Sequence, residues 1–206
     1  GDGGGACCRE PYQGRALDQL AEIYPELAMH QLDVSRGEEF LELKTALGEM
    51  PIDLLISNAG VLGPVQQGFG ETDYHLWNEV FTINTMASMR LAETFFQNLK
   101  DSEGRTLLCI SSIMGSITAN QVGGNYLYRT SKAALNALVK NLAMDLAGDE
   151  IRVLAMHPGW VQTEMGGEGA TVPPEQSAVR ILETLEQPLA QHSGSFLSYD
   201  GTTLPW

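Results

Sequence analysis

The chain has 206 residues, and its 26 acidic residues outnumber its 12 Lys and Arg, for a formal net charge of −14. A surface this acidic repels nucleic-acid backbones and anionic lipid headgroups, so we expect no nucleic-acid and no membrane partner. No apolar run reaches the ~18 residues that a membrane span needs. Three cysteines argue against a disulfide framework and favour a reducing, cytoplasmic setting, and four histidines without ligand spacing predict no metal site.

Helical and strand patterns alternate along the chain from about residue 14. The apolar runs expected to form strands are 27–33, 52–57, 106–111, 151–156 and 194–199. The segments expected to form helices are 14–24, 35–47 with Ser35 as its cap, 73–99, 125–147 and 174–186. Strands that are apolar throughout and separated by helices predict a parallel sheet covered on both faces. The expected fold class is therefore α/β, a doubly wound, Rossmann-like sheet forming a single domain over residues 1–206.

Small or polar residues stand at the carboxyl ends of four of these strands. They are Asp33, Asn58-Ala59-Gly60, Ser111-Ser112 and Pro158-Gly159, in chain order. At any single strand end, a turn residue or a helix cap is an adequate explanation. A doubly wound fold, however, binds its ligands at the carboxyl ends of its strands. Four such ends together therefore predict a ligand site at that edge of the sheet.

Tyr128 and Lys132 lie four residues apart near the start of an expected helix, which places both side chains on one face. An ammonium group beside a phenol favours the phenolate and lowers its pKa, as general acid/base chemistry requires. The spacing alone is weak evidence, because a surface tyrosine and a solvated lysine produce it equally well. Its position beside the four strand ends favours the chemical interpretation.

Several longer motifs accompany this pair. They are Leu32-Asp33-Val34, Ser57-Asn58-Ala59-Gly60, Ile83-Asn84, Ile110-Ser111-Ser112-Ile113-Met114-Gly115-Ser116, Tyr128-Arg129-Thr130-Ser131-Lys132-Ala133-Ala134-Leu135-Asn136 and Pro158-Gly159-Trp160-Val161-Gln162-Thr163. With these motifs the chain resembles the short-chain dehydrogenase/reductase family, from about residue 6 to its end. The resemblance is greatest to the branch of small bacterial and insect carbonyl reductases related to the C-factor developmental signal protein.

The resemblance implies catalytic roles for four residues. Tyr128 resembles the acid/base of the family, which protonates the nascent alkoxide in reduction and removes the hydroxyl proton in oxidation. Lys132 resembles the group that binds the nicotinamide ribose and lowers the tyrosine pKa. Ser112 matches the serine that polarises the substrate, with Ser111 as the weaker candidate. Asn84 resembles the asparagine that holds a water molecule in the proton relay, and its poor helix propensity makes a purely structural role less attractive.

The resemblance also implies a nicotinamide cofactor and a small carbonyl or alcohol substrate, between which a hydride is transferred. Asp33 and Val34 would face the adenine, and Asn58, Ala59 and Gly60 the cofactor backbone. Pro158, Gly159, Val161 and Thr163 would face the nicotinamide carboxamide. Arg9 resembles the arginine that meets the 2′-phosphate in members preferring NADP, so NADP(H) is favoured over NAD(H), although Glu10 is adjacent.

The N-terminal residues depart from the family pattern. A first strand, a Thr-Gly-x-x-x-Gly-x-Gly turn and a first helix are expected ahead of the residues seen here, and that turn would hold the pyrophosphate at a helix N-terminus. Gly1-Asp2-Gly3-Gly4-Gly5 does not match it. We therefore expect an N-terminally incomplete domain that lacks the first strand and first helix.

Two questions stay open at this level. The alternative function is that of a non-catalytic signalling or interaction protein that retains the fold without binding cofactor. The unmatched glycine turn favours this alternative, and the presence of Asn84, Ser112, Tyr128 and Lys132 opposes it. The resemblance also suggests a homodimer or homotetramer formed through the long helices. The residues that could form such an interface could equally be core residues; they are Met86, Met89, Leu91 and Phe95.

Overall fold

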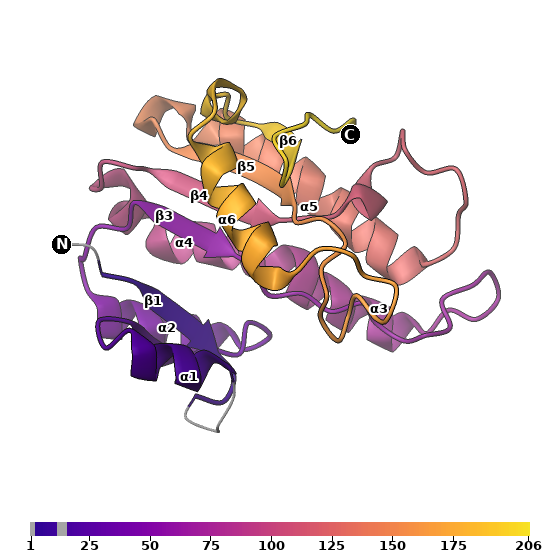
Figure 1. Cartoon of the computed structure of the whole chain (residues 1–206), viewed down its shortest axis with the longest axis horizontal. Coiled ribbons are helices and arrows are strands. Elements are labelled where there is room, and N and C mark those ends of the chain that lie inside the picture. The colour runs from indigo at the N-terminus through magenta and orange to yellow at the C-terminus, as the bar shows by residue number, and fades with distance from the viewer. Residues whose placement is uncertain (1–2, 12–15) are drawn as a thin grey trace. The chain divides into compact units, whose positions relative to one another are not determined.

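The computed structural model describes residues 3–11 and 16–206. Contacts divide the chain into two compact units, Gly1–Met50 and Pro51–Trp206, called here the N-terminal unit and the C-terminal unit. Both contain parallel strands with accompanying helices, which confirms the predicted α/β fold class (Figure 1). No helix in the described part of the chain has the length and apolar character needed to cross a membrane.

The N-terminal unit has one short parallel ladder, in which β1 (Gly5–Cys8) pairs with β2 (Ala28–Gln31). Its helices are α1 (Ala16–Ile23) and α2 (Gly37–Leu47). Phe40 and Leu43 are buried on α2, as the helical spacing predicts. Hydrophobic periodicity does not reveal β1, because four residues that begin with glycine are too short to show a strand period. The resemblance, which likens Arg9 to an arginine that follows a strand, agrees with β1 ending at Cys8. Gly1 and Asp2 of the glycine run lie outside the described residues.

The expected cap of α2 is wrong. Arg36 occupies the cap position and makes no side-chain cap hydrogen bond. The Ser35 hydroxyl and its backbone N–H instead donate to Asp33 Oδ1, at 2.7 and 2.9 Å. This is a local turn in which an aspartate side chain competes for the hydroxyl that the cap would have used. Asp33 is thereby fixed at the end of β2.

The C-terminal unit contains a four-stranded parallel sheet, as the alternating pattern predicts. Its strands, in spatial order, are β3 (Leu54–Ser57), β4 (Thr106–Ile110), β5 (Arg152–His157) and β6 (Ser195–Ser198). Because chain order and spatial order coincide and all pairs are parallel, every connection between neighbouring strands crosses a face of the sheet. All four carboxyl ends lie at one edge.

Helices cover both faces of this sheet (Figure 1). On one face, α4 (Ala87–Lys100) and α5 (Tyr126–Asp145) pack on side chains such as Leu107 and Val153. On the other face, α6 (Pro174–Leu185) packs on Leu108 and Leu154. Adjacent residues of one strand point to opposite faces, so a run that is apolar throughout is buried on both sides.

The long helix predicted over 73–99 is divided. It consists of α3 (Tyr74–Phe81), a π-helical turn η1 (Thr82–Met86) and α4. Asn84 lies in the middle of η1 and is 1% exposed. π-Helical turns are rare and are frequent at functional sites, and hydrophobic periodicity over a long window does not reveal them. Leu91 and Phe95, on α4, belong to the core, whereas Met86 is 48% exposed.

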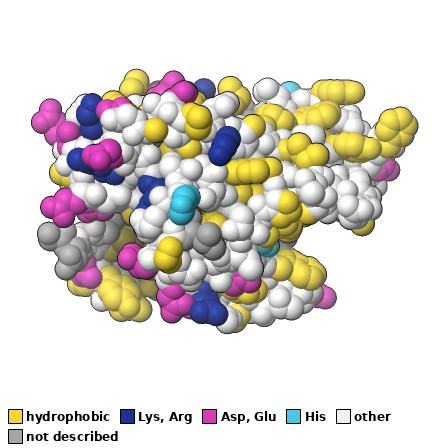
Figure 2. All heavy atoms as spheres, turned by 90° about the horizontal axis from the view of Figure 1, so that it is seen from above, with side chains coloured by type: hydrophobic (Ala, Val, Ile, Leu, Met, Phe, Trp, Pro, Cys, Tyr) yellow, Lys and Arg dark blue, Asp and Glu magenta, His cyan; other side chains and the backbone are white. Residues whose placement is uncertain are grey.

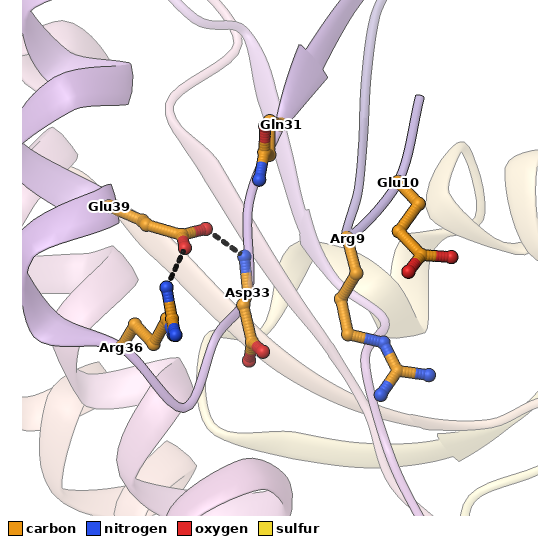
Figure 3. A pocket seen from close by; sticks show the side chains of 6 residues that line it. All are labelled: Arg9, Glu10, Gln31, Asp33, Arg36 and Glu39. Carbon is orange, nitrogen blue, oxygen red and sulfur yellow. Dashed lines mark hydrogen bonds and ion pairs between the residues drawn. The ribbon is translucent and has the colours of Figure 1, made fainter. Parts of the chain in front are cut away.

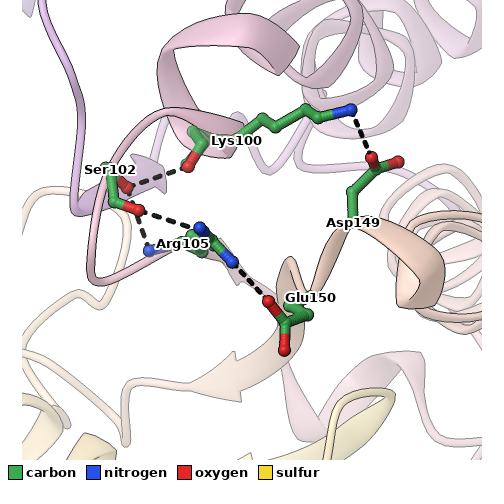
Figure 4. Close-up of polar contacts among 6 residues, drawn as sticks. Lys100, Ser102, Arg105, Asp149 and Glu150 are labelled. Carbon is green, nitrogen blue, oxygen red and sulfur yellow. Dashed lines mark hydrogen bonds and ion pairs between the residues drawn. The ribbon is translucent and has the colours of Figure 1, made fainter.

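Ion pairs hold the edge of the sheet opposite to the strand carboxyl ends (Figure 4). Lys100 Nζ lies 2.7 Å from Asp149 Oδ1, and Arg105 Nη1 lies 2.6 Å from Glu150 Oε2.

Three short helices complete the unit: η2 (Ile113–Gly115), η3 (Ala147–Asp149) and η4 (Pro188–Gln191). The thiols of Cys7, Cys8 and Cys109 are free.

Candidate active site

Tyr128 and Lys132 are brought together on the first turns of α5, at the carboxyl end of β4. Both are buried, with Tyr128 8% and Lys132 4% exposed, so a surface pair is excluded. Lys132 Nζ donates a hydrogen bond to the carbonyl oxygen of Ile110, the last residue of β4, at 2.8 Å. The same Nζ lies 5.9 Å from the centre of the Tyr128 ring. The ammonium group therefore sits between the strand end and the phenol.

The pKa of Tyr128 differs from the expectation. Burial raises it, and a hydrogen bond with Ser112 acts in the opposite direction. The net direction expected for the pKa of Tyr128 is therefore wrong, because desolvation of the phenolate is the largest cause. Burial also lowers the pKa of Lys132 to about 8, since the charged ammonium loses its hydration.

The two adjacent serines after β4 have different partners. Ser112 reaches the Tyr128 side chain, and its hydroxyl accepts a hydrogen bond from Met114 N at 3.2 Å. Ser111 Oγ instead donates to Asn136 Oδ1 at 2.6 Å in a buried pair. Successive residues after a strand point in opposite directions, so only one of them can face the phenol. Ser112, the preferred candidate, is the one that does.

Asn84 ties three parts of the C-terminal unit together. Its Oδ1 accepts from Val61 N at 2.8 Å, and its Nδ2 donates to Val61 O at 2.9 Å. Nδ2 also donates to Ser131 Oγ at 2.9 Å, and that hydroxyl donates to Tyr128 O at 2.8 Å. The side chain thus links the loop after β3 to the helix that carries Tyr128.

Two glycines shape the space around Lys132. At Gly115, a Cβ atom would lie 2.7 Å from the carbonyl carbon of Lys132, so only glycine lets η2 approach α5 this closely. At Gly60, a Cβ atom would lie 3.4 Å from Asn84 Oδ1 and 3.5 Å from Lys132 Nζ. A larger side chain at Gly60 would fill the space before the ammonium. Asn58, Ala59 and Gly60 follow β3 directly, and Gly60 is the one whose Cα lies next to Lys132 Nζ.

The segment after β5 is held by its own contacts. Pro158 O accepts from Ser177 Oγ at 2.6 Å. Gly159 has a φ of 85°, a left-handed conformation that favours glycine. Val161 makes an isolated parallel bridge within the loop, and the Thr163 hydroxyl accepts a backbone hydrogen bond at 3.2 Å. The four candidate residues of this loop thus follow β5 in an ordered turn.

Arg9, Asp33 and Val34 belong to the N-terminal unit. A pocket of about 400 Å³ opens there at the carboxyl ends of β1 and β2, lined by Arg9, Glu10, Gln31, Asp33, Arg36 and Glu39 (Figure 3). Hydrogen bonds from Ser35 lower the pKa of Asp33, and Arg9 and Arg36 act in the same direction. Arg9 is exposed. Val34, which follows Asp33 directly, is half-buried. The pocket therefore has a cationic side chain, Arg9, and an anionic one, Asp33, at the same edge of the strands.

A family model described as short chain dehydrogenase matches residues 6–171. The chain belongs to the short chain dehydrogenase family. It shares 40% identity over 156 residues with the C-signal of Myxococcus xanthus, covering 76% of this chain and 93% of that protein. It shares 34% identity over 181 residues with 1-hydroxy-2-glutathionyl-2-methyl-3-butene dehydrogenase of Rhodococcus sp. (strain AD45), covering 85% of this chain and 78% of that protein.

Solved structures of carbonyl reductases have the same fold. The carbonyl reductase Sniffer of D. melanogaster matches with a TM-score of 0.90 and 30% identity, over 98% of this chain and 87% of that one. The NADPH-bound carbonyl reductase from chicken fatty liver matches with a TM-score of 0.87 and 31% identity, over the same shares of 98% and 87%. These similarities confirm the resemblance inferred from the motifs and make this chain an NAD(P)-dependent oxidoreductase of the short chain dehydrogenase family.

Large hydrophobic side chains of this short chain dehydrogenase are exposed on its surface (Figure 2). On the loops after β3 and after η2 they are Val65 at 98%, Phe69 at 94%, Ile117 at 78% and Val122 at 82% exposed. Trp160, on the loop after β5, is 55% exposed. These side chains lie on loops and contribute little to the core.

One buried residue on these loops was not predicted. Gln67 is 3% exposed, and it bonds to the first turn of α5 as well as to its own loop. A single glutamine in a loop carries no sequence pattern, so only the fold reveals it.

Proposed function

We propose that the protein reduces uncharged carbonyl compounds to alcohols with NADP(H), and that Tyr128 is the proton donor. The observation that carries this proposal is the buried cluster in which Tyr128 bonds with Ser112 and lies beside the ammonium of Lys132. The cluster stands at the carboxyl ends of β3 and β4, where a parallel sheet of this kind binds its ligands.

The protein groups act on the carbonyl oxygen. The hydroxyls of Ser112 and Tyr128 donate hydrogen bonds to it, and these bonds strengthen as negative charge develops on the oxygen. When bound, the nicotinamide supplies the hydride that reduces the carbonyl carbon. Tyr128 then gives its proton to the oxygen, which completes the alcohol, and the phenolate regains a proton from solvent. Until that proton returns, the positive charge of Lys132 stabilises the Tyr128 phenolate.

Each unit, taken by itself, contains residues that suit one part of a nicotinamide cofactor. In the C-terminal unit, Gly60 leaves open the space before Lys132 Nζ, where a ribose would be held. In the N-terminal unit, the pocket with Arg9 and Asp33 would hold the adenosine end. The preference for NADP(H) rests on the guanidinium of Arg9, since arginine binds phosphate through two parallel hydrogen bonds. A carbonyl reductase of Pseudomonas aeruginosa PAO1 with 32% identity has a structure in complex with NADP, which supports the same choice.

A substrate without an anionic group is favoured by the composition of the loops near the cluster. Residues 61–73, 113–125 and 160–173 contain no Lys or Arg, so a carboxylate or phosphate group would find no partner charge on them. Their exposed side chains are instead large and apolar, as at Val65 and Ile117. Such walls favour an apolar carbonyl compound.

The test follows the oxidation of NADPH and NADH in the presence and absence of a panel of aldehydes and ketones. We expect carbonyl-dependent oxidation that is faster with NADPH at low nucleotide concentration. Arg9→Ala should remove that preference by raising the KM for NADPH about tenfold while sparing NADH, and exposed Arg180→Ala on α6 is the control. An unchanged preference in Arg9→Ala would remove the assignment of Arg9.

A second candidate is a signalling protein that retains the fold without turnover, and its support is the 40% identity to a protein named C-signal. Titration with NADPH separates the two functions, using Trp77 and Trp160 as fluorescence reporters. Absence of any nucleotide-dependent change, together with absence of turnover, would favour the signalling candidate. Saturable binding with turnover would exclude it.

Three free thiols, one of them exposed at Cys7, support a reducing, cytoplasmic setting.

We also propose a homodimer or homotetramer, as the family resemblance suggests. Of the candidate interface residues, Leu91 and Phe95 lie in the core and Met86 is 48% exposed, so light scattering during gel filtration is the measurement that decides it.

A further inference from the structure

The helix that carries Tyr128 begins in an unusual way. Gly123, Gly124 and Asn125 all have positive φ values, of 66°, 64° and 46°. A helix cap normally has an extended backbone, so that its side chain can accept a hydrogen bond from the first turn. Asn125, in the left-handed conformation, makes no side-chain cap hydrogen bond. The helix therefore lacks a cap from its own segment.

This leaves backbone donors of the first turn without partners inside the helix. The first intrahelical bond at this end runs from Arg129 N to Asn125 O at 2.9 Å, so the N–H groups of Tyr126, Leu127 and Tyr128 precede it. Buried N–H groups without a partner are costly, and Leu127 and Tyr128 are both buried. Another part of the chain has to supply acceptors.

Gln67 supplies two of them from the loop after β3. Its side-chain Oε1 accepts from Tyr128 N at 3.1 Å, and its backbone oxygen accepts from Tyr126 N at 3.4 Å. Its amide nitrogen donates to Leu62 O and Pro64 O, both at 2.8 Å. Both polar atoms of the amide are thus hydrogen-bonded, and the side chain joins the start of α5 to the loop.

The backbone of Tyr128 is consequently held at both ends. Its N–H is bonded to Gln67, and its carbonyl oxygen accepts the Ser131 hydroxyl, which in turn accepts from Asn84. Asn84 also holds Val61, a few residues before Gln67 on the same loop. Gln67 and Val61 of the loop are therefore both connected to Tyr128 by hydrogen bonds, Gln67 directly and Val61 through Asn84 and Ser131.

We propose that Gln67 is a positioning residue of the reaction, one that caps α5 from a distant loop and fixes the Tyr128 phenol relative to Ser112 and Lys132. This inference rests on the proposed function. A catalytic group displaced by about 1 Å can lose about 100-fold in rate, so a bond that fixes its backbone acts on turnover without touching the substrate. The same bonds couple the loop to the catalytic helix.

The matched experiment uses two neighbouring glutamines. Gln67→Met keeps the length of the side chain and removes its hydrogen bonds, whereas Gln66→Met changes an exposed residue beside it. We expect kcat to fall about 10- to 100-fold in Gln67→Met, with the KM for NADPH within about twofold and the alkaline limb of the kcat–pH profile displaced. Amide hydrogen exchange at Tyr128 should become at least about tenfold faster, because its acceptor is gone.

A second variant tests the inference even if Gln67→Met fails to fold. Gln67→Glu keeps an acceptor for Tyr128 N but turns a carboxylate toward two carbonyl oxygens. Protonation at acidic pH restores one donor, so its turnover relative to the wild type should rise as pH falls. The inference would be overturned if the turnover of Gln67→Glu relative to the wild type did not change with pH. It would also be overturned if Gln67→Met had the same kcat and the same amide exchange rate at Tyr128 as Gln66→Met.

Failure of the proposed function gives a different pattern. If Tyr128→Phe turned over like the wild type, the proton-donor assignment would fall together with this role of Gln67, although faster exchange at Tyr128 would still identify the cap. If Tyr128→Phe were inactive and Gln67→Met were fully active, only the inference about Gln67 would fall.

Discussion

Asn84 binds both polar groups of the Val61 backbone, accepting from its N–H at 2.8 Å and donating to its carbonyl at 2.9 Å. A side-chain amide accepts through its oxygen and donates through its nitrogen in parallel, as another peptide group would. Because Asn84 stands on the π-helical turn, the widened helix presents this amide to the loop after β3. The contact therefore sets where the loop passes the cluster of Ser112, Tyr128 and Lys132.

Replacement of this amide is the first prediction. Asn84→Asp keeps the acceptor for Val61 N and places an oxygen where Nδ2 donates to Val61 O and Ser131 Oγ. We expect a loss of about 1–3 kcal/mol in the free energy of unfolding, since buried acceptors lose their donor, together with lower turnover. Urea unfolding measures the loss of stability, and the control is Asn78→Asp, at an exposed position on α3. Equal stability of the two variants would contradict the role of the amide.

The serine pair gives a second prediction. Ser112→Ala removes the hydroxyl that bonds with Tyr128 and should lower kcat by about 100-fold, as removal of one oxyanion donor does. Ser111→Ala breaks the buried bond to Asn136 and should reduce stability by about 1 kcal/mol with little change in kcat. Steady-state kinetics and thermal melting of both variants measure the difference. The reverse pattern would assign the substrate oxygen to Ser111.

A third prediction concerns the packing of η2 on α5. Gly115→Ala would place a Cβ atom 2.7 Å from the backbone of Lys132, so the turn that carries Ser112 must move. We expect a loss of about 1–3 kcal/mol in stability and a decrease in kcat. Gly148→Ala is the control, because a Cβ there meets nothing within 4 Å. If the two variants melted alike, the close approach would be unimportant.

The pH dependence of stability gives a fourth prediction. Burial lowers the pKa of Lys132 from 10.5 to about 8, so between these values the unfolded chain binds more protons than the folded one. Stability contributed by Lys132 should therefore rise with pH across that window, by about 3 kcal/mol in total, and stay constant below it. The measurement is the difference in unfolding free energy between the wild type and Lys132→Met from pH 7 to about 10.5. A difference that is independent of pH would contradict the burial of a charged ammonium.

The sheet and the juxtaposition of Tyr128 with Lys132 were predictable from local patterns. Apolar runs such as 106–111 and the polar residues that follow them are set by neighbours in sequence, and β4 matches to within one residue at Thr106–Ile110. Tyr128 and Lys132 share a helical face by spacing alone, and the structure brings Ser112 to the same place.

Other features depend on contacts between distant segments. The π-helical turn at Thr82–Met86 is held by bonds to Val61 and Ser131, which no window of the sequence contains. The cap of α5 is Gln67, 61 residues before Tyr128. The pKa of Tyr128 was predicted in the wrong direction because burial, which raises it, is a property of the whole fold.

The central claim is that Tyr128 donates the proton. Tyr128→Phe keeps the ring and removes the hydroxyl, while Tyr126→Phe makes the same change at a tyrosine that is 37% exposed on the same helix turn. The most direct measurement is kcat for carbonyl-dependent NADPH oxidation in both variants, beside the affinity for NADPH. The account predicts that Tyr128→Phe loses about 100- to 10,000-fold in kcat with its nucleotide affinity within a few-fold of the wild type, and that Tyr126→Phe is unaffected. Full turnover by Tyr128→Phe would contradict it.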